Sequence, residues 1–299
     1  MSSANVIFLF VMLVGPILTF SSSSWMLCWV GVELTFLGFI PLIYSGSSMN
    51  KEAAIKYFCV QALSSGILFM SGILYLQGSS ILWTYLFIIS LGLKLGLFPG
   101  HFWVPSVVSS LDYFPMFLLL TWQKLPPLGL MCLCMDSAET VWNLALLMGG
   151  LSSVVGGILG NNFNSTRAML GASSIAHSGW LVVGATSGSM WFYFILYSLV
   201  TMAGMMMMWD NNSTSIAFFI LSLSGLPPFL MFLGKYSVLL DAYYMGLDTM
   251  YLLLPVLGTV LSLSFYLKFT YSYYVNSTEI YLPMSLFTLN VLGLLYLFL

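Results

Sequence analysis

Charged side chains are scarce in this sequence. Asp, Glu, Lys and Arg make up 5% of its 299 residues, whereas soluble proteins average about 25%. No stretch is polar enough to cover a sizeable soluble domain, and no basic patch could neutralise the phosphates of a nucleic acid. The shortage of charge therefore argues against a soluble enzyme and against a nucleic-acid-binding protein.

Motifs for metals and nucleotides are also missing. The four cysteines lie in apolar segments and form no Cys-x-x-Cys or Cys/His cluster, which argues against an iron–sulfur centre; they are Cys28, Cys59, Cys132 and Cys134. No Gly-rich nucleotide fingerprint occurs. The amino terminus lacks the basic region and cleavage site of a signal peptide, so the first apolar stretch is expected to be a retained helix.

Hydrophobic residues, in contrast, make up 60% of the chain. Nearly every window of about 20 residues has the composition of a membrane helix. Eleven spans are predicted, at 4–20, 24–44, 53–77, 80–109, 113–135, 138–160, 166–185, 189–209, 215–240, 250–273 and 281–299. The sequence thus predicts an all-α polytopic membrane protein of about 11 transmembrane helices. An odd number of spans places the two termini on opposite sides of the membrane.

The few positive charges predict how the chain is oriented. Lysine and arginine occur in or near the loops on the amino-terminal side, at Lys51, Lys56, Arg167 and Lys268. The opposite loops carry acidic residues, namely Asp136, Glu139 and Asp248. Because positive residues favour the inner compartment, the amino terminus is expected to face it.

Two of the predicted spans contain prolines that interrupt a helix. The fourth includes GLKLGLFPGHFWVP at 92–105, and the ninth includes SLSGLPPFLMFLGK at 222–235. Proline removes a backbone donor, and interrupted membrane helices at corresponding places in two halves point to a transport site. The layout therefore predicts two inverted five-helix repeats, at 1–135 and 138–273, followed by a C-terminal helix at 281–299.

Four charged residues lie deep inside apolar spans: Glu33, Lys94, Lys124 and Lys235. Each costs about 2.5–3.5 kcal/mol at the centre of a bilayer, so such residues usually line an ion or proton route. Glu33 on the second span and Lys94 on the fourth are expected to form an ion pair that keeps both charged. Two interpretations stay open: a static tether between helices, or a switch that opens and closes.

The other two lysines are candidate proton-relay groups. Lys124 lies midway along the fifth span, directly before a Leu-Pro-Pro run, with no acidic residue well placed on its own helix. Burial disfavours the charged form of a lysine, which suits a group that takes up and releases a proton. The alternative for Lys124 is a structural residue with an unrecognised partner elsewhere in the chain. Lys235 follows the ninth-span break and is interpreted as an entry or exit station of the route, with an interfacial residue as the alternative.

Two histidines add further candidates. His177 lies on the seventh span within SSIAHSGW, where it is either a relay group that titrates near neutrality or a hydrogen-bonded packing residue. His101 lies at the kink of the fourth span, where it either relays protons or caps the carbonyls that the kink frees.

Six segments of the chain resemble, in the same order, a mitochondrially encoded family: subunit 2 of NADH–ubiquinone oxidoreductase, which is respiratory complex I. They are SSSSWMLCWVGVELTFLGFIPLI (21–43), EAAIKYFCVQALSSGILF (52–69), GLKLGLFPGHFWVPSVV (92–108), LTWQKLPPL (120–128), RAMLGASSIAHSGW (167–180) and SLSGLPPFLMFLGK (222–235). The resemblance implies an eleven-helix, antiporter-like subunit that translocates protons. It implies that Glu33 and Lys94 are the family's ion pair, Lys124 its central lysine and Lys235 its terminal lysine.

The same resemblance also has implications for cofactors, partners and location. The subunit carries no cofactor of its own, and FMN, iron–sulfur clusters and ubiquinone act elsewhere in the complex. Its partners are other membrane-arm subunits in an obligate hetero-oligomer, together with membrane lipids. Its place is the mitochondrial inner membrane, with the amino terminus on the matrix side and the carboxyl terminus on the intermembrane-space side. A stand-alone cation/proton antiporter and a purely structural membrane subunit are the alternatives.

Overall fold

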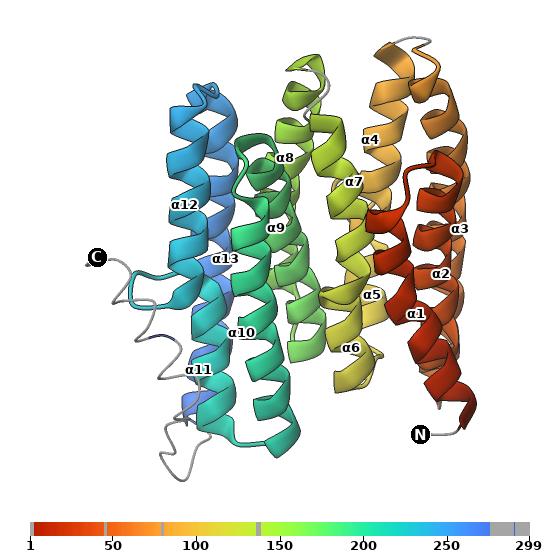
Figure 1. Cartoon of the computed structure of the whole chain (residues 1–299). Helices are drawn as coiled ribbons and strands as arrows, with labels where there is room; N and C mark the ends of the chain where they lie inside the picture. The colour runs from red at the N-terminus through yellow and green to blue at the C-terminus, as the bar shows by residue number, and fades with distance from the viewer. Residues whose placement is uncertain (1–2, 45–46, 79–80, 136–138, 276–289, 291–299) are drawn as a thin grey trace. The chain divides into compact units, whose positions relative to one another are not determined.

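The computed structural model describes residues 3–44, 47–78, 81–135, 139–275 and 290. Within these residues every regular element is helical and no strand occurs (Figure 1). The chain divides into two compact units, unit 1 at residues 1–148 and unit 2 at residues 149–299.

Unit 1 is built around α1, α2 and α3, which pack in succession (Figure 1). A Cβ added to Gly31 would lie 2.8 Å from the backbone oxygen of Gly15, so glycine at these positions lets the α1 and α2 backbones touch. Its elements are α1 (Ser3–Ser21), α2 (Trp25–Tyr44), α3 (Ser48–Leu76), α4 (Ile81–Leu95), α5 (Trp103–Val108), α6 (Tyr113–Leu120), the 3₁₀ turn η1 (Trp122–Lys124), α7 (Leu125–Met135) and the first part of α8 (Glu139–Asn162).

The fourth predicted span is interrupted where its sequence predicts a break. Helix α4 ends at Leu95, and Gly96 follows in the left-handed conformation with φ +71°. The backbone N–H of Leu97 donates to the Gly92 oxygen at 2.8 Å, and that of Gly96 donates to the Leu93 oxygen at 3.2 Å. This is a Schellman end, which glycine favours because it has no Cβ to clash.

The fifth predicted span, in contrast, is not a single helix. The α-helical hydrogen bonding stops at Leu120, and η1 separates α6 from α7. Pro126 and Pro127 occupy the first turn of α7, the one position in a helix where a missing N–H is tolerated. These two successive prolines are the feature of the sequence that indicates the division, and a new helix begins with them.

Unit 2 contains the remaining helices, of which α10 lies beside α9, α11 and α12, and α13 beside α9 and α11. The ninth predicted span is broken as its prolines predict. Helix α11 ends at Ser224, Gly225 has φ +76°, and α12 begins at Leu230. The elements are the rest of α8, α9 (Thr166–Ser187), α10 (Met190–Asp210), α11 (Ser213–Ser224), α12 (Leu230–Tyr244) and α13 (Thr249–Val275).

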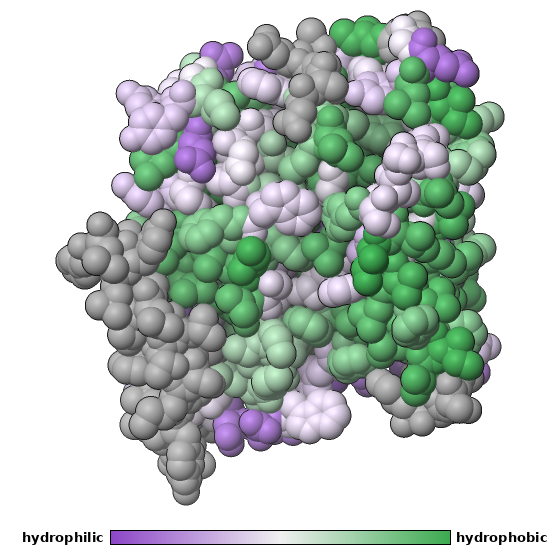
Figure 2. All heavy atoms as spheres, in the orientation of Figure 1, coloured by the Kyte–Doolittle hydropathy of each residue, from purple (hydrophilic) through white to green (hydrophobic). Residues whose placement is uncertain are grey.

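Seven described helical stretches are long and apolar enough to cross a membrane. The broken spans supply shorter apolar helices, including Ile81–Leu95 and Ser213–Ser224. On the visible side of unit 1, hydrophobic residues cover the helices between more hydrophilic ends (Figure 2). The predicted helix at 281–299 lies outside the described residues except for Asn290, so the count of eleven stays a prediction.

Gly156 of α8 packs directly against the backbone of α9. A Cβ on Gly156 of α8 would lie 2.7 Å from the Ala176 nitrogen and 2.8 Å from the Ala172 oxygen, both on α9. Gly156→Ala is expected to lower the free energy of unfolding by about 1–3 kcal/mol through overpacking. At Gly66 on α3 nothing lies within 4 Å of a new Cβ, so Gly66→Ala should instead stabilise by up to about 1 kcal/mol. Thermal unfolding of the purified protein in detergent measures both, and equal effects would contradict this packing.

Candidate functional site

The buried charges of unit 1 meet between α2 and α4. Lys94 Nζ lies 3.9 Å from Glu33 Oε1, and their side chains are 2% and 16% exposed. Neither of these two atoms has a hydrogen-bond partner among the described residues. At this distance the two groups attract by charge without a hydrogen bond. The pair is therefore close but loosely held.

The end of α4 places Lys94 beside its partners. Lys94 lies in the last turn of α4, where the helix dipole presents partial negative charge. The Gln61 side chain on α3 donates to the Lys94 backbone oxygen at 3.2 Å, and the Trp103 indole donates to the Leu93 oxygen at 3.2 Å. The carbonyls that the break frees are thus satisfied by side chains from α3 and α5. Lys94 Nζ also lies over the Phe36 ring, 5.8 Å from its centroid, a cation–π contact.

Lys124 is the last residue of η1 and is 6% exposed. Its neighbour Gln123 fixes the turn to two other helices: its amide donates to the Thr35 oxygen on α2 at 3.0 Å and accepts from the Tyr57 hydroxyl on α3 at 3.3 Å. Because α2 also carries Glu33, the same helix anchors both the turn of Lys124 and the acidic partner of Lys94. Sequence reasoning missed Gln61, Tyr57 and Gln123, although a glutamine in an apolar span was a visible signal.

His101 lies in the segment between α4 and α5 and is 3% exposed. Its ring is 5.9 Å from the ring of Phe98 and 4.0 Å from that of Phe102, measured between centroids. Its Nδ1 has no hydrogen-bond partner among the described residues.

Unit 2 holds Lys235 on α12, 7% exposed. Its Nζ donates to the Ser224 backbone oxygen at 2.8 Å, which is the carboxyl end of α11. The partial negative charge of that helix end stabilises the ammonium group. Lys235, Ser224 and Trp180 line a pocket of about 230 Å³ whose other walls are mainly apolar side chains of α12 and α13.

His177 lies on α9 in unit 2 and is 2% exposed. Its Nδ1 lies 2.7 Å from the Tyr193 hydroxyl on α10, and its Nε2 lies 3.3 Å from the Tyr266 hydroxyl on α13. Both ring nitrogens are therefore hydrogen-bonded. Neither tyrosine was singled out from the sequence, because tyrosine is common in apolar spans.

The candidates thus fall into two sets. Unit 1 contains Glu33, Lys94, Lys124 and His101, whereas His177 and Lys235 belong to unit 2. No group of three His, Cys, Asp or Glu side chains that could hold a metal ion occurs in the part of the chain that the structure describes. The chemistry available at these positions is the holding and transfer of protons.

The ion pair can be tested by a double-mutant cycle. Glu33→Gln and Lys94→Met are each expected to destabilise by about 3 kcal/mol, because each leaves a buried charge without its partner. The double variant should cost less than the sum, with a coupling of about 1–3 kcal/mol in thermal unfolding. Strictly additive costs would show that the two side chains do not interact.

The contact of Lys235 with the α11 end can be tested through Gly225. A Cβ at this position would lie 2.6 Å from Lys235 Nζ, whereas at Gly246, with φ +69°, nothing lies within 4 Å. Gly225→Ala and Gly246→Ala share a backbone strain of roughly 1–2 kcal/mol. Gly225→Ala should cost about 1–3 kcal/mol more, because it displaces the ammonium group from the Ser224 oxygen.

Repeating both substitutions in a Lys235→Ala background separates backbone strain from displacement of the Lys235 ammonium group. With Lys235→Ala already present, the excess cost of Gly225→Ala over Gly246→Ala should vanish in the same unfolding measurement. An excess that persists would mean that Gly225 acts independently of Lys235.

Comparison with known proteins places this arrangement in a family. A family model described as "NADH:quinone oxidoreductase/Mrp antiporter, TM" matches residues 22–211. The NADH-ubiquinone oxidoreductase chain 2 of Albinaria caerulea is 34% identical over 286 residues, which cover 93% of this chain and 93% of that protein. The protein of the same name from Branchiostoma lanceolatum is 35% identical over 299 residues, covering 89% of this chain and 84% of that one.

A solved structure shares the fold. A chain of respiratory complex I from Thermus thermophilus superimposes with a TM-score of 0.85 at 22% identity, over 98% of this chain and 78% of that chain. At that identity the likeness concerns the fold alone. The sequence relatives carry the assignment: the chain belongs to the NADH-ubiquinone oxidoreductase chain 2 family.

Proposed function

We propose that this chain is a proton-translocating, antiporter-like subunit of the membrane arm of NADH:ubiquinone oxidoreductase. The observation that carries the proposal is the loosely held Glu33–Lys94 pair, 3.9 Å apart beside a broken helix. Buried charges in apolar helices are costly and usually mark ion or proton routes. The buried Lys124, Lys235 and His177 extend the set of groups that can carry a proton.

The chain works without redox chemistry of its own. FMN, the iron–sulfur clusters and ubiquinone react elsewhere in the complex, and the chain couples to that reaction through other membrane-arm subunits in an obligate hetero-oligomer. It lies in the mitochondrial inner membrane, surrounded by lipid, with its amino terminus on the matrix side. Its contribution to the enzyme is the movement of protons.

The Glu33–Lys94 pair acts as a switch. When the carboxylate approaches, it favours the charged lysine, and when the pair opens, the buried ammonium loses that support and releases its proton more readily. Because no direct hydrogen bond joins the two atoms, opening breaks only the charge attraction. Lys124 is the next acceptor in unit 1, while Lys235 and His177 serve unit 2.

Lys124→Met tests the relay role in the assembled complex, reconstituted in liposomes. Methionine keeps an unbranched side chain of similar size and removes the titratable group. We expect proton pumping per NADH oxidised to fall well below the wild-type value while the complex still assembles. Lys268→Met is the matched control, since Lys268 is exposed and bonds to loop residue Asn164 at 3.4 Å; it should pump normally.

Two results would change the assignment. Unchanged pumping stoichiometry in Lys124→Met would remove the relay role and leave a structural subunit. Sodium- or potassium-driven proton flux by the isolated chain would instead identify a self-sufficient antiporter. Co-purification with other membrane-arm subunits favours the proposed function over that alternative.

A further inference from the structure

Helix α12 begins at the second break with an N-cap residue that cannot cap it. Its first residue is Leu230, and the N-cap residue Phe229 has no side-chain atom that could accept a hydrogen bond. Pro227 and Pro228 stand directly before them. The first backbone N–H groups of a helix have no partner within the helix. Because Leu230 is only 5% exposed, its N–H needs an acceptor from elsewhere in the chain.

That acceptor is the side chain of Asn290. The Leu230 N–H donates to Asn290 Oδ1 at 3.1 Å, across a separation of 60 residues. Asn290 belongs to the predicted span at 281–299 and is 5% exposed. A backbone N–H can only donate, so the amide oxygen faces the helix start. The other amide atom, Nδ2, has no hydrogen-bond partner among the described residues. Asn290 therefore acts on α12 through its oxygen.

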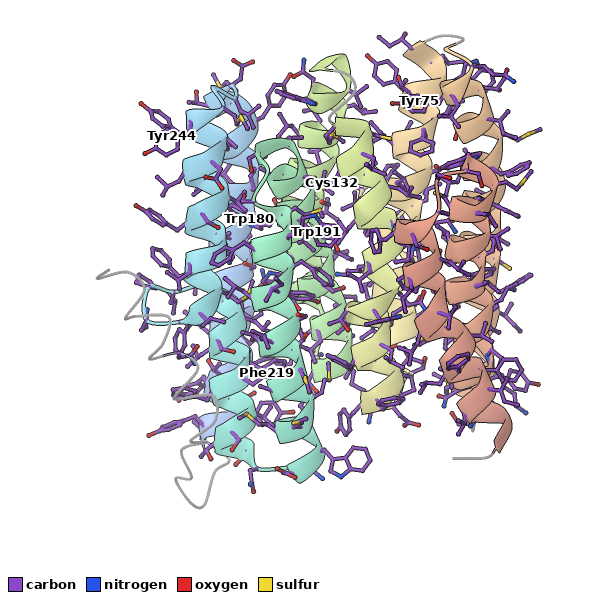
Figure 3. The ribbon with its side chains drawn as sticks, in the orientation of Figure 1. Tyr75, Cys132, Trp180, Trp191, Phe219 and Tyr244 are labelled. Atoms are coloured by element: carbon purple, nitrogen blue, oxygen red, sulfur yellow. The ribbon has the colours of Figure 1, made fainter. Side chains whose placement is uncertain are left out.

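The capped turn supports the backbone of Lys235. In an α-helix the N–H of residue 235 bonds to the carbonyl of residue 231, so opening of the first turn frees the backbone at Lys235. The Lys235 side chain donates to the Ser224 oxygen, on the other side of the break, at 2.8 Å. Trp180, labelled on α9 in Figure 3, lines the same pocket as these two residues. The position of the ammonium group thus depends on where α12 begins.

We propose that Asn290 is a positioning residue, which caps α12 from the last predicted span and thereby keeps Lys235 against the end of α11. The inference rests on the proposed function, to which it adds one residue. Two bonds hold the start of α12: the cap at Leu230 and, about one and a half turns later, the bond from Lys235 to Ser224. Loss of the cap opens the first turn and lets the ammonium group move away from the Ser224 oxygen.

Asn290→Leu tests the cap, because leucine keeps a side chain of similar size and removes the accepting oxygen. In the purified complex, amide hydrogen exchange in the peptide that covers the start of α12 should become about 5-fold faster, the effect of losing one helix cap. Peptides from α10 should exchange as in wild type. Asn290→Asp keeps an accepting oxygen and should restore the wild-type exchange.

Asn212→Leu is the matched control. Asn212 is the N-cap residue of α11, the other half of the same broken span, and its side chain makes no capping hydrogen bond. The substitution removes the same amide group from an exposed position. Exchange at the starts of α11 and α12 should therefore stay as in wild type, and so should proton pumping.

The positioning role has a separate readout, the reactivity of the Lys235 amine. In Asn290→Leu, acetic anhydride should acetylate Lys235 several-fold faster, as measured by mass spectrometry, because the amine has left the Ser224 oxygen. Lys124 in unit 1 should react as in wild type. Proton pumping by the reconstituted complex should fall in Asn290→Leu and recover in Asn290→Asp. If the leucine variant does not assemble, Asn290→Ala gives the same comparison.

The outcomes separate this inference from the function on which it rests. Unchanged exchange at the start of α12 in Asn290→Leu would overturn the cap. Faster exchange with unchanged acetylation of Lys235 would overturn the positioning role. If Lys124→Met pumps normally, the proposed function fails, whereas exchange and acetylation still decide whether Asn290 positions Lys235.

Discussion

A positive charge buried in an apolar helix bundle must be offset, and here broken helices supply the offset. Lys94 occupies the last turn of α4, and Lys235 donates to the Ser224 oxygen that ends α11. Both helices end at a glycine with positive φ, Gly96 and Gly225. The carboxyl end of a helix carries partial negative charge. Each break therefore creates a place where a lysine can remain away from water.

The two lysines are held with different strength, and this difference fits different roles. Lys235 makes a direct hydrogen bond of 2.8 Å to a backbone oxygen that cannot move independently of its helix. Lys94 faces a carboxylate at 3.9 Å with no hydrogen bond between the two atoms. A side-chain partner without a hydrogen bond can separate by rotation alone, which suits a switch. A backbone partner, in contrast, holds the Lys235 ammonium group in one position.

Hydrogen bonds from neighbouring side chains fix the positions of the segments that carry the titratable groups. Gln123 ties the turn of Lys124 to α2 and α3, and the Trp103 indole satisfies a carbonyl at the end of α4. In unit 2 two tyrosines fix the ring of His177. Most buried polar groups in proteins are hydrogen-bonded, since burial removes them from water. The same bonds that stabilise the fold thus aim the titratable groups.

The sequence by itself determined the helical class, the positions of most helices, the two breaks and the buried lysines. These follow from long apolar runs, from prolines and from the rarity of charge, which are properties of the chain read locally. It did not reveal the division of the fifth span at Lys124, because Pro126 and Pro127, its one sign in the sequence, also fit the first turn of an α-helix.

Only the tertiary structure decided which side chains meet. Glu33 and Lys94 are 61 residues apart by their numbers, and the bond of His177 to Tyr266 spans 89 residues. Tyr57, Gln61, Tyr193 and Tyr266 face these groups only after their helices pack. Hydropathy reports how deeply a residue is buried, whereas hydrogen bonding depends on direction and distance between helices. That geometry fixes which of the buried groups can exchange a proton.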